Sequence, residues 1–526
     1  MERYPIGKQD FKSLREGGFT YVDKTSFIIK LLEGAGFYFL ARPRRFGKSL
    51  FLSTLDYFFK GEKKLFEGLA IEKYNWEWNE FPVIHLDFGI SGYSSPEFLY
   101  DTLNTSLEKY ETLYEVSILE KNNLTDRFRR IIEAAYIKTG LKVVVLVDEY
   151  EKPVIDNIEN PDILEKNRSF LRGFYSVLKS LDKYLQMVFM TGVTKFGQMS
   201  VFSGLNNIRD ISLNPDFTAI CGITYEELVL YFKDGINNLA KEEEINFEDS
   251  LKLLKENYDG YHFSKDLTDI YNPYSIINAL ADRTIKAYWA STGTPSLLVD
   301  MIKEKNINIE KIEGVQVTDN KLLGINHQLD DPITLLFQSG YLTIKNYDKT
   351  GKTYTLDYPN LEVEQAFFDY LLPNFSGINI VLTESFIERF NLSLKSGDPY
   401  KAMATLEEFT AGISYDVMPS IETEKHFQFL VYIISKLILP RRSHVKVEDK
   451  TSDGRIDLLI MTSKFVYIIE IKKDKSAEKA LNQIKEKEYA LQFRNDTRKI
   501  FLIGMNFSTK KKRIEGFKIE EVIEKR

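Results

Sequence analysis

The chain has 526 residues, of which 43% are hydrophobic, and its formal net charge is −7. This length exceeds what one hydrophobic core usually serves, so two to four domains are expected, and the composition excludes long disorder. A single cysteine, Cys221, excludes a disulfide framework, and the five scattered histidines exclude a zinc-ligand pattern, so any metal should be bound by oxygen atoms.

The ends of the chain differ in character. The start, MERYPIGKQDFK, lacks a secretion signal, and no apolar run approaches the roughly 20 residues of a membrane span, so we expect a cytoplasmic protein without a membrane partner. Residues 421–526 hold 24 Lys and Arg against 16 Asp and Glu, a balance of +8 that leaves −15 for residues 1–420. A basic terminal domain suits contact with a polyanion such as nucleic acid. The alternative is that surplus lysine only keeps the surface soluble.

Four apolar runs in the first half of the chain predict strands. The runs are continuous, as in strands buried on both faces of a parallel sheet, and helical stretches such as 161–183 lie between them. This alternation predicts a parallel sheet with crossover helices. The predicted strands are GFYFLA (36–41), PVIHLDF (82–88), KVVVLVDEY (142–150) and YLQMVFMTGVT (184–194).

The loop after the first predicted strand has the features of a phosphate-binding loop. Gly47, Lys48 and Ser49 follow a strand and open a helix. Phosphate binds where N–H groups converge at a helix N-terminus, with a lysine for charge and a hydroxyl for Mg²⁺. The tripeptide alone is a weak signal, so its acidic partner matters.

That partner follows the apolar run Val143–Val147, which ends in Asp148 and Glu149. In nucleoside triphosphatases with such a loop, the first acid holds Mg²⁺ through water and the second polarises the attacking water. The two motifs predict ATP and Mg²⁺ binding, with Ser49 and Asp148 at the metal and Glu149 catalytic. A surface turn and a strand that happens to end in acids are the alternative.

The loop departs from the general pattern because Arg42 stands where its first glycine is expected. Arg42, Arg44 and Arg45 could touch phosphate or serve a neighbouring subunit of a homo-oligomer, or they could face solvent. The predicted nucleotide-binding set is Arg45, Phe46, Gly47, Lys48, Ser49, Asp148 and Thr191.

Two further segments are candidates for nucleotide contact. Thr191 and Thr194 end the fourth strand, where such folds place a sensor of the γ-phosphate, unless they only cap the strand. The turn Gly293-Thr294-Pro295 could lie against the adenine.

From about residue 224 the pattern changes to helices, such as TYEELVLYFKDGINNLA. Residues 333–358 predict a helix and then a β-hairpin with its turn at Asp348-Lys349-Thr350-Gly351, which suggests a winged-helix-like module. Helices continue to about residue 420. A last α/β unit is expected with a helix at 422–438, strands near 455–460 and 465–471, a helix at 476–492 and a strand at 499–504.

Charged residues interrupt the apolar strands of this last unit. Residues two apart share a face of a strand, so Glu470 and Lys472 point together. Asp457 lies within another apolar run, where an unpaired carboxylate is costly. Two carboxylates beside a lysine can form a divalent-metal site for phosphodiester chemistry. A structural salt bridge between Glu470 and Lys472 is the alternative.

Neighbouring helices add polar residues to this set. Glu424 precedes the strands, and Gln483 and Lys485 follow them, at spacings that can present a polar edge to the same site. Each alone would be an ordinary solvated residue, but the order Glu, Asp, Glu-x-Lys, Gln points to phosphodiester chemistry.

Several long segments carry a specific resemblance. They are YPIGKQDFKSLREGGFTYVDKT, ARPRRFGKSL, LVDEYEKPV, FSGLNN, WASTGTP and TSDGRIDLLI…VYIIEIKKDKSAEKALNQIKEKEYA. With them, nearly the whole chain resembles the bacterial AAA-ATPase-like proteins that carry a C-terminal PD-(D/E)XK nuclease-superfamily domain. The loop of that family itself has the RPRRFGKS form.

The resemblance implies roles for the C-terminal residues. Asp457 and Glu470 become ligands of Mg²⁺, or of Mn²⁺, and Lys472 becomes catalytic. Glu424 and Gln483 correspond to accessory helix positions.

The resemblance also implies a fold and a function. We expect a P-loop NTPase core with three α/β/α layers (1–223), a helical, nucleotide-dependent lid with a winged-helix-like module (224–375), a helical connector (376–420) and a restriction-endonuclease-like α/β domain (421–526). We expect an ATP-regulated, Mg²⁺-dependent nuclease that acts on nucleic acid, DNA rather than RNA, in defence or mobile-element processing. The alternative is a nucleotide-dependent switch or scaffold whose nuclease-fold domain binds nucleic acid or protein without cutting.

Overall fold

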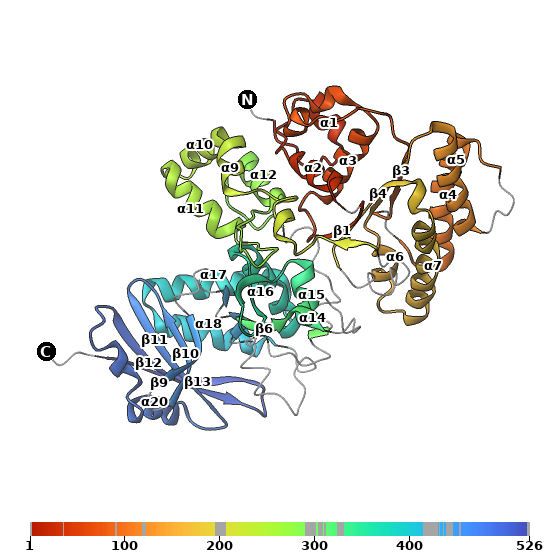
Figure 1. The fold of residues 1–526 in the computed structure, drawn as a ribbon. Coiled ribbons are helices and arrows are strands. Elements are labelled where there is room, and N and C mark those ends of the chain that lie inside the picture. The colour runs from red at the N-terminus through yellow and green to blue at the C-terminus, as the bar shows by residue number, and fades with distance from the viewer. Residues whose placement is uncertain are drawn as a thin grey trace. The chain divides into compact units, whose positions relative to one another are not determined.

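A computed structural model of the chain describes residues 3–34, 36–89, 92–117, 123–194, 207–289, 301–302, 309, 312–322, 331–413, 430, 432–434, 436–437, 445–451 and 454–522. The chain divides into two compact units (Figure 1), namely Met1–Thr292 with Lys311–Glu362, and Gly293–Glu310 with Val363–Arg526. Within the described residues, no helix is both long and apolar enough to cross a bilayer.

The first unit contains a five-stranded parallel sheet in the order β2-β3-β4-β1-β5. All residues of β1 and β3 are buried, which explains why their sequences are continuous apolar runs. The four predicted strands are confirmed, whereas the two-residue β5 was not predicted. The strands are β1 (Phe37–Ala41), β2 (Val83–Asp87), β3 (Val143–Asp148), β4 (Leu185–Gly192) and β5 (Arg209–Asp210).

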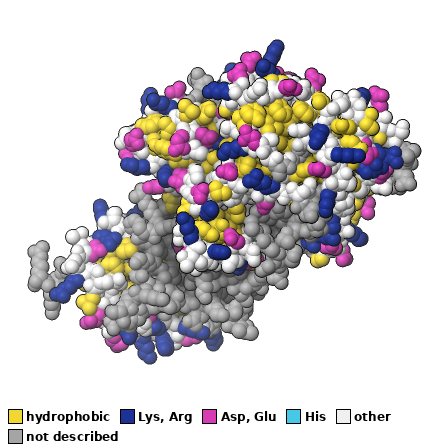
Figure 2. Space-filling view, viewed as in Figure 1, with side chains coloured by type: hydrophobic (Ala, Val, Ile, Leu, Met, Phe, Trp, Pro, Cys, Tyr) yellow, Lys and Arg dark blue, Asp and Glu magenta, His cyan; other side chains and the backbone are white. Residues whose placement is uncertain are grey.

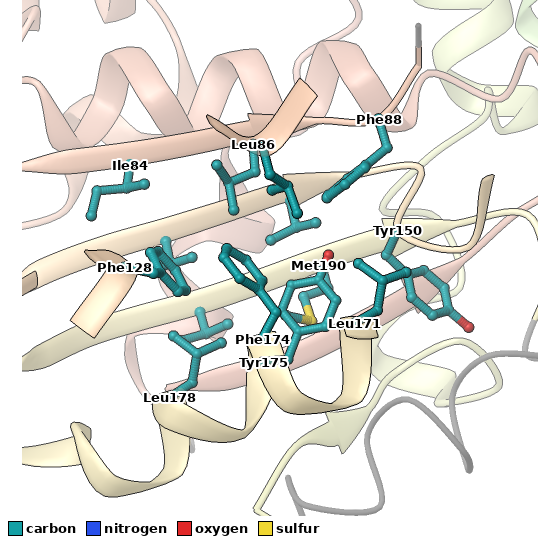
Figure 3. Close-up of a cluster of buried hydrophobic side chains, with 14 of the residues drawn as sticks. Ile84, Leu86, Phe88, Phe128, Tyr150, Leu171, Phe174, Tyr175, Leu178 and Met190 are labelled. Atoms are coloured by element: carbon teal, nitrogen blue, oxygen red, sulfur yellow. The ribbon is translucent and has the colours of Figure 1, made fainter. Parts of the chain in front are cut away.

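Helices cover both faces of this sheet and complete a three-layer α/β/α core. On one face, Phe128 stacks on Phe174 with ring centroids 4.7 Å apart, within a cluster that also contains Ile84 and Met190 (Figure 3). On the other face α3 packs against β3 and β4, and Phe51 contacts Phe189. The helices are α1 (Phe11–Glu16), α2 (Ser26–Leu32), α3 (Lys48–Phe59), α4 (Pro96–Tyr114), α5 (Leu124–Thr139), α6 (Lys152–Ile155) and α7 (Pro161–Ser180).

Four short helices follow the sheet and form a helical lid with its own core. Thr224 and Glu227 form a capping box at the start of the first helix, which fixes where the lid begins. Apolar residues such as Ile236, Leu254 and Ile276 meet in the lid core. The helices are α9 (Tyr225–Tyr231), α10 (Lys233–Glu242), α11 (Phe247–Tyr258) and α12 (Pro273–Asp282).

Two helices and a small antiparallel sheet complete the described part of the first unit. The hairpin turn lies at the predicted position, where the Thr350 N–H donates to Asp348 at 2.9 Å. The sheet has the order β6-β8-β7, so it contains one strand more than the predicted hairpin. The elements are β6 (Val315–Thr318), α14 (Asp319–Leu322), α15 (Pro332–Ser339), β7 (Thr343–Asp348) and β8 (Thr353–Asp357).

The second unit combines helices with a five-stranded mixed sheet in the order β13-β12-β11-β10-β9. β11 and β12 are parallel, and the other neighbours are antiparallel. The predicted helix at 422–438 lies mostly outside the described residues, and β9 and β13 were not predicted. The elements are α16 (Leu361–Ser376), α17 (Ile380–Ser396), α18 (Pro399–Ala411), β9 (Val445–Thr451), β10 (Gly454–Met461), β11 (Phe465–Lys473), α20 (Ala477–Glu486), the 3₁₀ helix η8 (Tyr489–Phe493), β12 (Lys499–Ser508) and β13 (Arg513–Glu521).

Candidate functional sites

The Gly-Lys-Ser tripeptide lies where β1 passes into α3. β1 ends at Ala41 and α3 begins at Lys48, so the loop presents the first N–H groups of the helix at the carboxyl edge of the parallel sheet. Gly47 caps the helix with φ of +93°, a left-handed conformation that favours glycine. The local geometry is therefore that of a phosphate-binding loop.

Lys48 is 6% exposed, and its ammonium is bound inside the loop. Nζ donates to the carbonyl oxygens of Arg42 at 2.9 Å and Pro43 at 3.1 Å. Burial lowers the pKa of Lys48, while the charges of Asp148 and Glu149 oppose that shift. An anionic phosphate is a stronger acceptor than these neutral carbonyls, so the lysine is poised to exchange them for a ligand.

The two acids at the end of β3 have different surroundings. Asp148 is buried and accepts a hydrogen bond from the Thr191 hydroxyl, which joins the ends of β3 and β4. Glu149 has φ of +49°, which is uncommon for a residue with a side chain and clusters at functional sites. Burial raises the pKa of Glu149, and Lys48 opposes the rise. Thr191 is thus a hydrogen-bond partner of Asp148 rather than a free strand cap.

A third acid, Glu151, lies near Asp148 and Lys48, and the sequence interpretation did not single it out. Its carboxylate accepts the backbone N–H groups of Val193 and Thr194, and its Oε2 is buried without a hydrogen-bond partner among the described residues. Burial raises the pKa of Glu151 to about 7. Gly192 is required beside it, because a Cβ there would lie 2.3 Å from Oε2.

The arginines of the loop divide into two groups. Arg42 is 1% exposed and donates to the carbonyl oxygens of Ser212 at 2.6 Å and Phe217 at 3.1 Å. Its guanidinium is therefore held inside its own chain, which corrects all three expectations for this residue, namely contact with phosphate, service to a neighbouring subunit and exposure to solvent. Arg44 and Arg45 are exposed, and the Arg45 guanidinium lies over the Tyr274 ring at 4.9 Å from its centroid.

The side chain of Phe46 packs away from any phosphate. It is 1% exposed and meets Tyr261 and Phe263 edge-on, with ring centroids 4.8 and 5.2 Å away. Its carbonyl accepts the Gly222 N–H. Only its own backbone N–H therefore remains as a phosphate contact, and the side chain fastens the loop to the segment after α11.

A mostly apolar pocket of about 80 Å³ adjoins Gly47 at the start of α3. One polar group at the pocket is Lys24, whose Nζ donates to both carboxylate oxygens of Glu227 at 2.7 and 2.6 Å. The predicted adenine turn Gly293-Thr294-Pro295 lies outside the described residues. The pocket is lined by Pro5, Thr20, Tyr21, Val22, Lys24, Phe46, Gly47, Leu50, Phe51, Ile220, Cys221, Gly222, Ile223, Phe232, Pro273 and Ile277.

The C-terminal charges meet on neighbouring strands β10 and β11. The register pairs Leu458 with Ile469, so Asp457 stands opposite Glu470. An oxygen of Asp457 accepts the Ile471 N–H at 2.8 Å, and Lys472 donates to Oε1 of Glu470 at 2.8 Å. The salt bridge that was the alternative interpretation is therefore formed, and it uses one oxygen of Glu470.

The other oxygen of Glu470 is left open. Glu470 is 2% exposed, and its Oε2 has no hydrogen-bond partner among the described residues. Burial, together with the charge of Asp457, raises the pKa of Glu470 to about 7. A buried acceptor without a donor is costly, and a divalent cation held by one or two carboxylates and water would satisfy it.

The accessory residues fall in different places. Gln483 lies in α20, and its amide donates to Oε1 of Glu470, as the sequence suggested. Lys485 instead pairs with Glu520 on β13 at 2.5 Å, because a residue two positions along a helix points to another side. Glu424 lies outside the described residues. Those residues contain no group of three or more His, Cys, Asp or Glu placed to hold a metal.

Two family models match different parts of the chain. A family model described as predicted AAA-ATPase matches residues 5–202, and one described as PD-(D/E)XK nuclease superfamily matches residues 422–517. The ORC1 protein of Aeropyrum pernix, solved in complex with DNA, is 10% identical with a TM-score of 0.22, a similarity too low to carry an argument. The match covers 65% of this chain and 90% of that chain.

One relative matches this chain from end to end. It is described as an uncharacterized protein in the vnfD 5' region of Azotobacter chroococcum mcd 1, and it is 33% identical over 528 residues, which is 99% of both chains. The chain therefore belongs to the family of predicted AAA-ATPases that carry a PD-(D/E)XK nuclease-superfamily domain at their C-terminal end.

Proposed function

We propose that the chain binds and hydrolyses ATP with Mg²⁺ in its first unit and cleaves phosphodiester bonds of nucleic acid in its second. The observation that carries the second activity is the buried, unpartnered Oε2 of Glu470 beside Asp457 and Lys472. A buried carboxylate oxygen without a hydrogen-bond donor, on an otherwise apolar strand, favours a cation site over a purely structural salt bridge.

In the ATP site, the N–H groups that open α3 bind the phosphates and Lys48 adds its charge. Ser49 and Asp148 would hold Mg²⁺, which neutralises charge on the phosphates. Thr191 orients Asp148, and Glu149 holds the attacking water. The mostly apolar pocket beside Gly47 supports a nucleobase site at this position.

In the nuclease-type site, Asp457 and Glu470 would hold the divalent ion, which activates water and steadies charge on the phosphate. Gln483 fixes the orientation of Glu470, and Lys472 positions the water. The water oxygen bonds to phosphorus, the bond from phosphorus to the leaving sugar oxygen breaks, and that oxygen gains the proton that the water loses.

The charge distribution favours a local nucleic-acid contact. The C-terminal segment carries the positive surplus, while the rest of the chain is acidic. On the face drawn in Figure 2, positive and negative side chains are interspersed over most of the described surface. Nucleic acid is therefore expected to bind the last domain rather than to coat the molecule, and we propose DNA as the substrate.

The test is a cleavage assay on the purified full-length chain. Supercoiled plasmid and a labelled single-stranded oligonucleotide are incubated with Mg²⁺ or Mn²⁺, with and without ATP. We expect cleavage by the wild type and none by Asp457→Ala, with Lys485→Ala as the control that keeps activity. Intact substrates under every condition with a folded wild-type protein would refute cleavage and leave a nucleotide-dependent scaffold.

A further inference from the structure

Asn506 on β12 lies beside the nuclease-type site, and no motif had singled it out. β12 runs parallel to β11, and the register pairs Glu470 with Gly504 and Lys472 with Asn506. Directly paired residues of neighbouring strands project from the same face of a sheet. Asn506 therefore projects from the same face as Lys472 on the neighbouring strand, two residues beyond the pair of Glu470 and Gly504.

The helix that packs on this face, α20, contacts β12 two residues before Asn506. A Cβ at Gly504 would lie 2.2 Å from the carbonyl oxygen of Ala477 and 2.4 Å from the N atom of Leu481. The first turn of α20 therefore rests directly on Gly504. Asn506 lies two residues further along β12, toward the edge where the strand ends and a substrate would approach.

The strand is also irregular at this point. The pairing of β12 with β13 shifts between Asn506 and Phe507, and Gly516, which has no side chain, stands opposite Asn506. Bulges of this kind re-aim side chains and occur frequently beside active sites.

The amide oxygen of Asn506 is an unsatisfied acceptor. Oδ1 is buried and has no hydrogen-bond partner within the described part of the chain. Oε2 of Glu470, two residues back along the paired strands, is also buried without a hydrogen-bond partner among the described residues. A hydrated metal ion could satisfy both atoms, because the cation would bind the carboxylate oxygen and a water molecule would donate a hydrogen bond to the amide oxygen.

We propose that Asn506 is a positioning residue of the nuclease-type site and that its Oδ1 accepts a hydrogen bond from the attacking water beside Lys472. The inference rests on the cleavage activity proposed above. One hydrogen of the water is held by Asn506, so that the oxygen lone pair is directed at phosphorus while the other proton leaves. The residue acts on the orientation of the water and not on the binding of nucleic acid.

Three variants of the full-length protein test this role. Asn506→Leu keeps the size and removes the acceptor, Asn506→Asp keeps an acceptor, and Asn482→Leu repeats the apolar change at an exposed position of α20. We expect kcat on the labelled oligonucleotide with Mn²⁺ to fall about 10- to 100-fold in Asn506→Leu with little change in KM. Asn506→Asp should retain most of the activity, and Asn482→Leu all of it.

A second measurement is independent of the loaded site. Thermal unfolding in metal-free buffer should give Asn506→Leu a Tm equal to or above that of the wild type, because an unsatisfied buried acceptor has been removed. A parallel loss of Tm and activity would show that Asn506 is structural and overturn the proposal.

The remaining outcomes separate the two proposals. If the wild type and Asn506→Leu cleave the oligonucleotide equally well, the role of Asn506 is overturned and the proposed function stays intact. A wild type that is folded but cleaves nothing overturns both.

Discussion

The two sites hold their lysines in opposite ways. Lys48 is buried and donates to the neutral carbonyl oxygens of Arg42 and Pro43. The side chain of Lys472 is 25% exposed and donates to the carboxylate of Glu470. A ligand displaces neutral acceptors at the first lysine, but it must join an existing ion pair at the second.

Asp148 of the first site and Glu470 of the second also differ in how their carboxylate oxygens are hydrogen-bonded. Asp148 receives a hydroxyl hydrogen bond from Thr191, whereas Glu470 keeps one buried oxygen open and has its pKa raised to about 7. The contrast holds for these two acids only, because Glu151 beside the first site also has a raised pKa and a buried oxygen without a hydrogen-bond partner among the described residues. The buried open oxygen of Glu470 has an electrostatic cost that the proposed cation would relieve. Each prediction below can break this contrast or make it sharper.

The largest effect is expected from Glu470→Gln. An amide is a poor ligand for a hard cation, so cleavage should fall at least about 1,000-fold in the oligonucleotide assay. The matched change Glu486→Gln, at an exposed position of α20, should leave cleavage unchanged. Equal activity of the two variants would remove Glu470 from the site.

The same variant has a pH signature in metal-free protein. Because the folded-state pKa of Glu470 is raised to about 7 from 4.5, the stability linked to its bound proton is fully present below pH 4.5. It is lost as the pH rises through 7. Calorimetry at pH 5 and pH 8 should therefore show a smaller decrease in Tm for Glu470→Gln than for the wild type. Equal decreases would contradict the stored electrostatic cost.

Next in size is Lys48→Ala. The loop loses its ammonium, so the affinity for ATP should weaken about 100-fold or more, measured by titration with a fluorescent ATP analogue. Lys60→Ala is the control, because Lys60 follows the same helix and is exposed. Unchanged binding by Lys48→Ala would show that the loop does not hold the triphosphate.

A smaller effect is expected from Gln483→Leu. Its amide fixes Glu470, so cleavage should fall about 10- to 100-fold, as for other groups that orient metal ligands. Lys485→Ala, two residues away and paired with Glu520, should have no effect on kcat. If both variants lose activity equally, α20 acts through packing instead of through this hydrogen bond.

The smallest effect is expected from Gly192→Ala. The new methyl would overlap Oε2 of Glu151, so the free energy of unfolding should fall by about 1–3 kcal/mol. Gly173→Ala in α7 meets nothing within 4 Å and should stabilise the protein by about 0.5–1 kcal/mol. Chemical denaturation followed by tryptophan fluorescence measures both. A neutral Gly192→Ala would mean that Glu151 moves freely.

The sequence predicted the buried elements of both units and missed the strands at their edges. β1 and β3 were predictable because burial on both faces demands continuous apolar residues. β5 spans two residues and β13 is largely exposed, so neither carries that pattern. The four-part division of the chain stays a prediction.

The contacts of the candidate site residues followed a similar rule, although their roles stay predictions. The contact of Glu470 with Lys472 was predictable because both interrupt an apolar strand, whereas Glu151 resembles the ordinary start of a helix. Its role depends on backbone groups of β4, and the partners of Arg42 lie about 170 residues away. Contacts between residues so far apart in the chain produce no local sequence pattern that would predict them. Glu424 and the turn at Gly293 remain predictions.

Arg42 has a further consequence for how the protein tolerates mutation. Its guanidinium joins the nucleotide loop to the carbonyl oxygens of Ser212, Phe217 and Thr218. The loop is thereby preorganised, so a ligand need not spend binding energy on ordering it. We therefore expect an insertion or deletion near residue 215 to weaken ATP binding, even though every residue of the loop itself is unaltered.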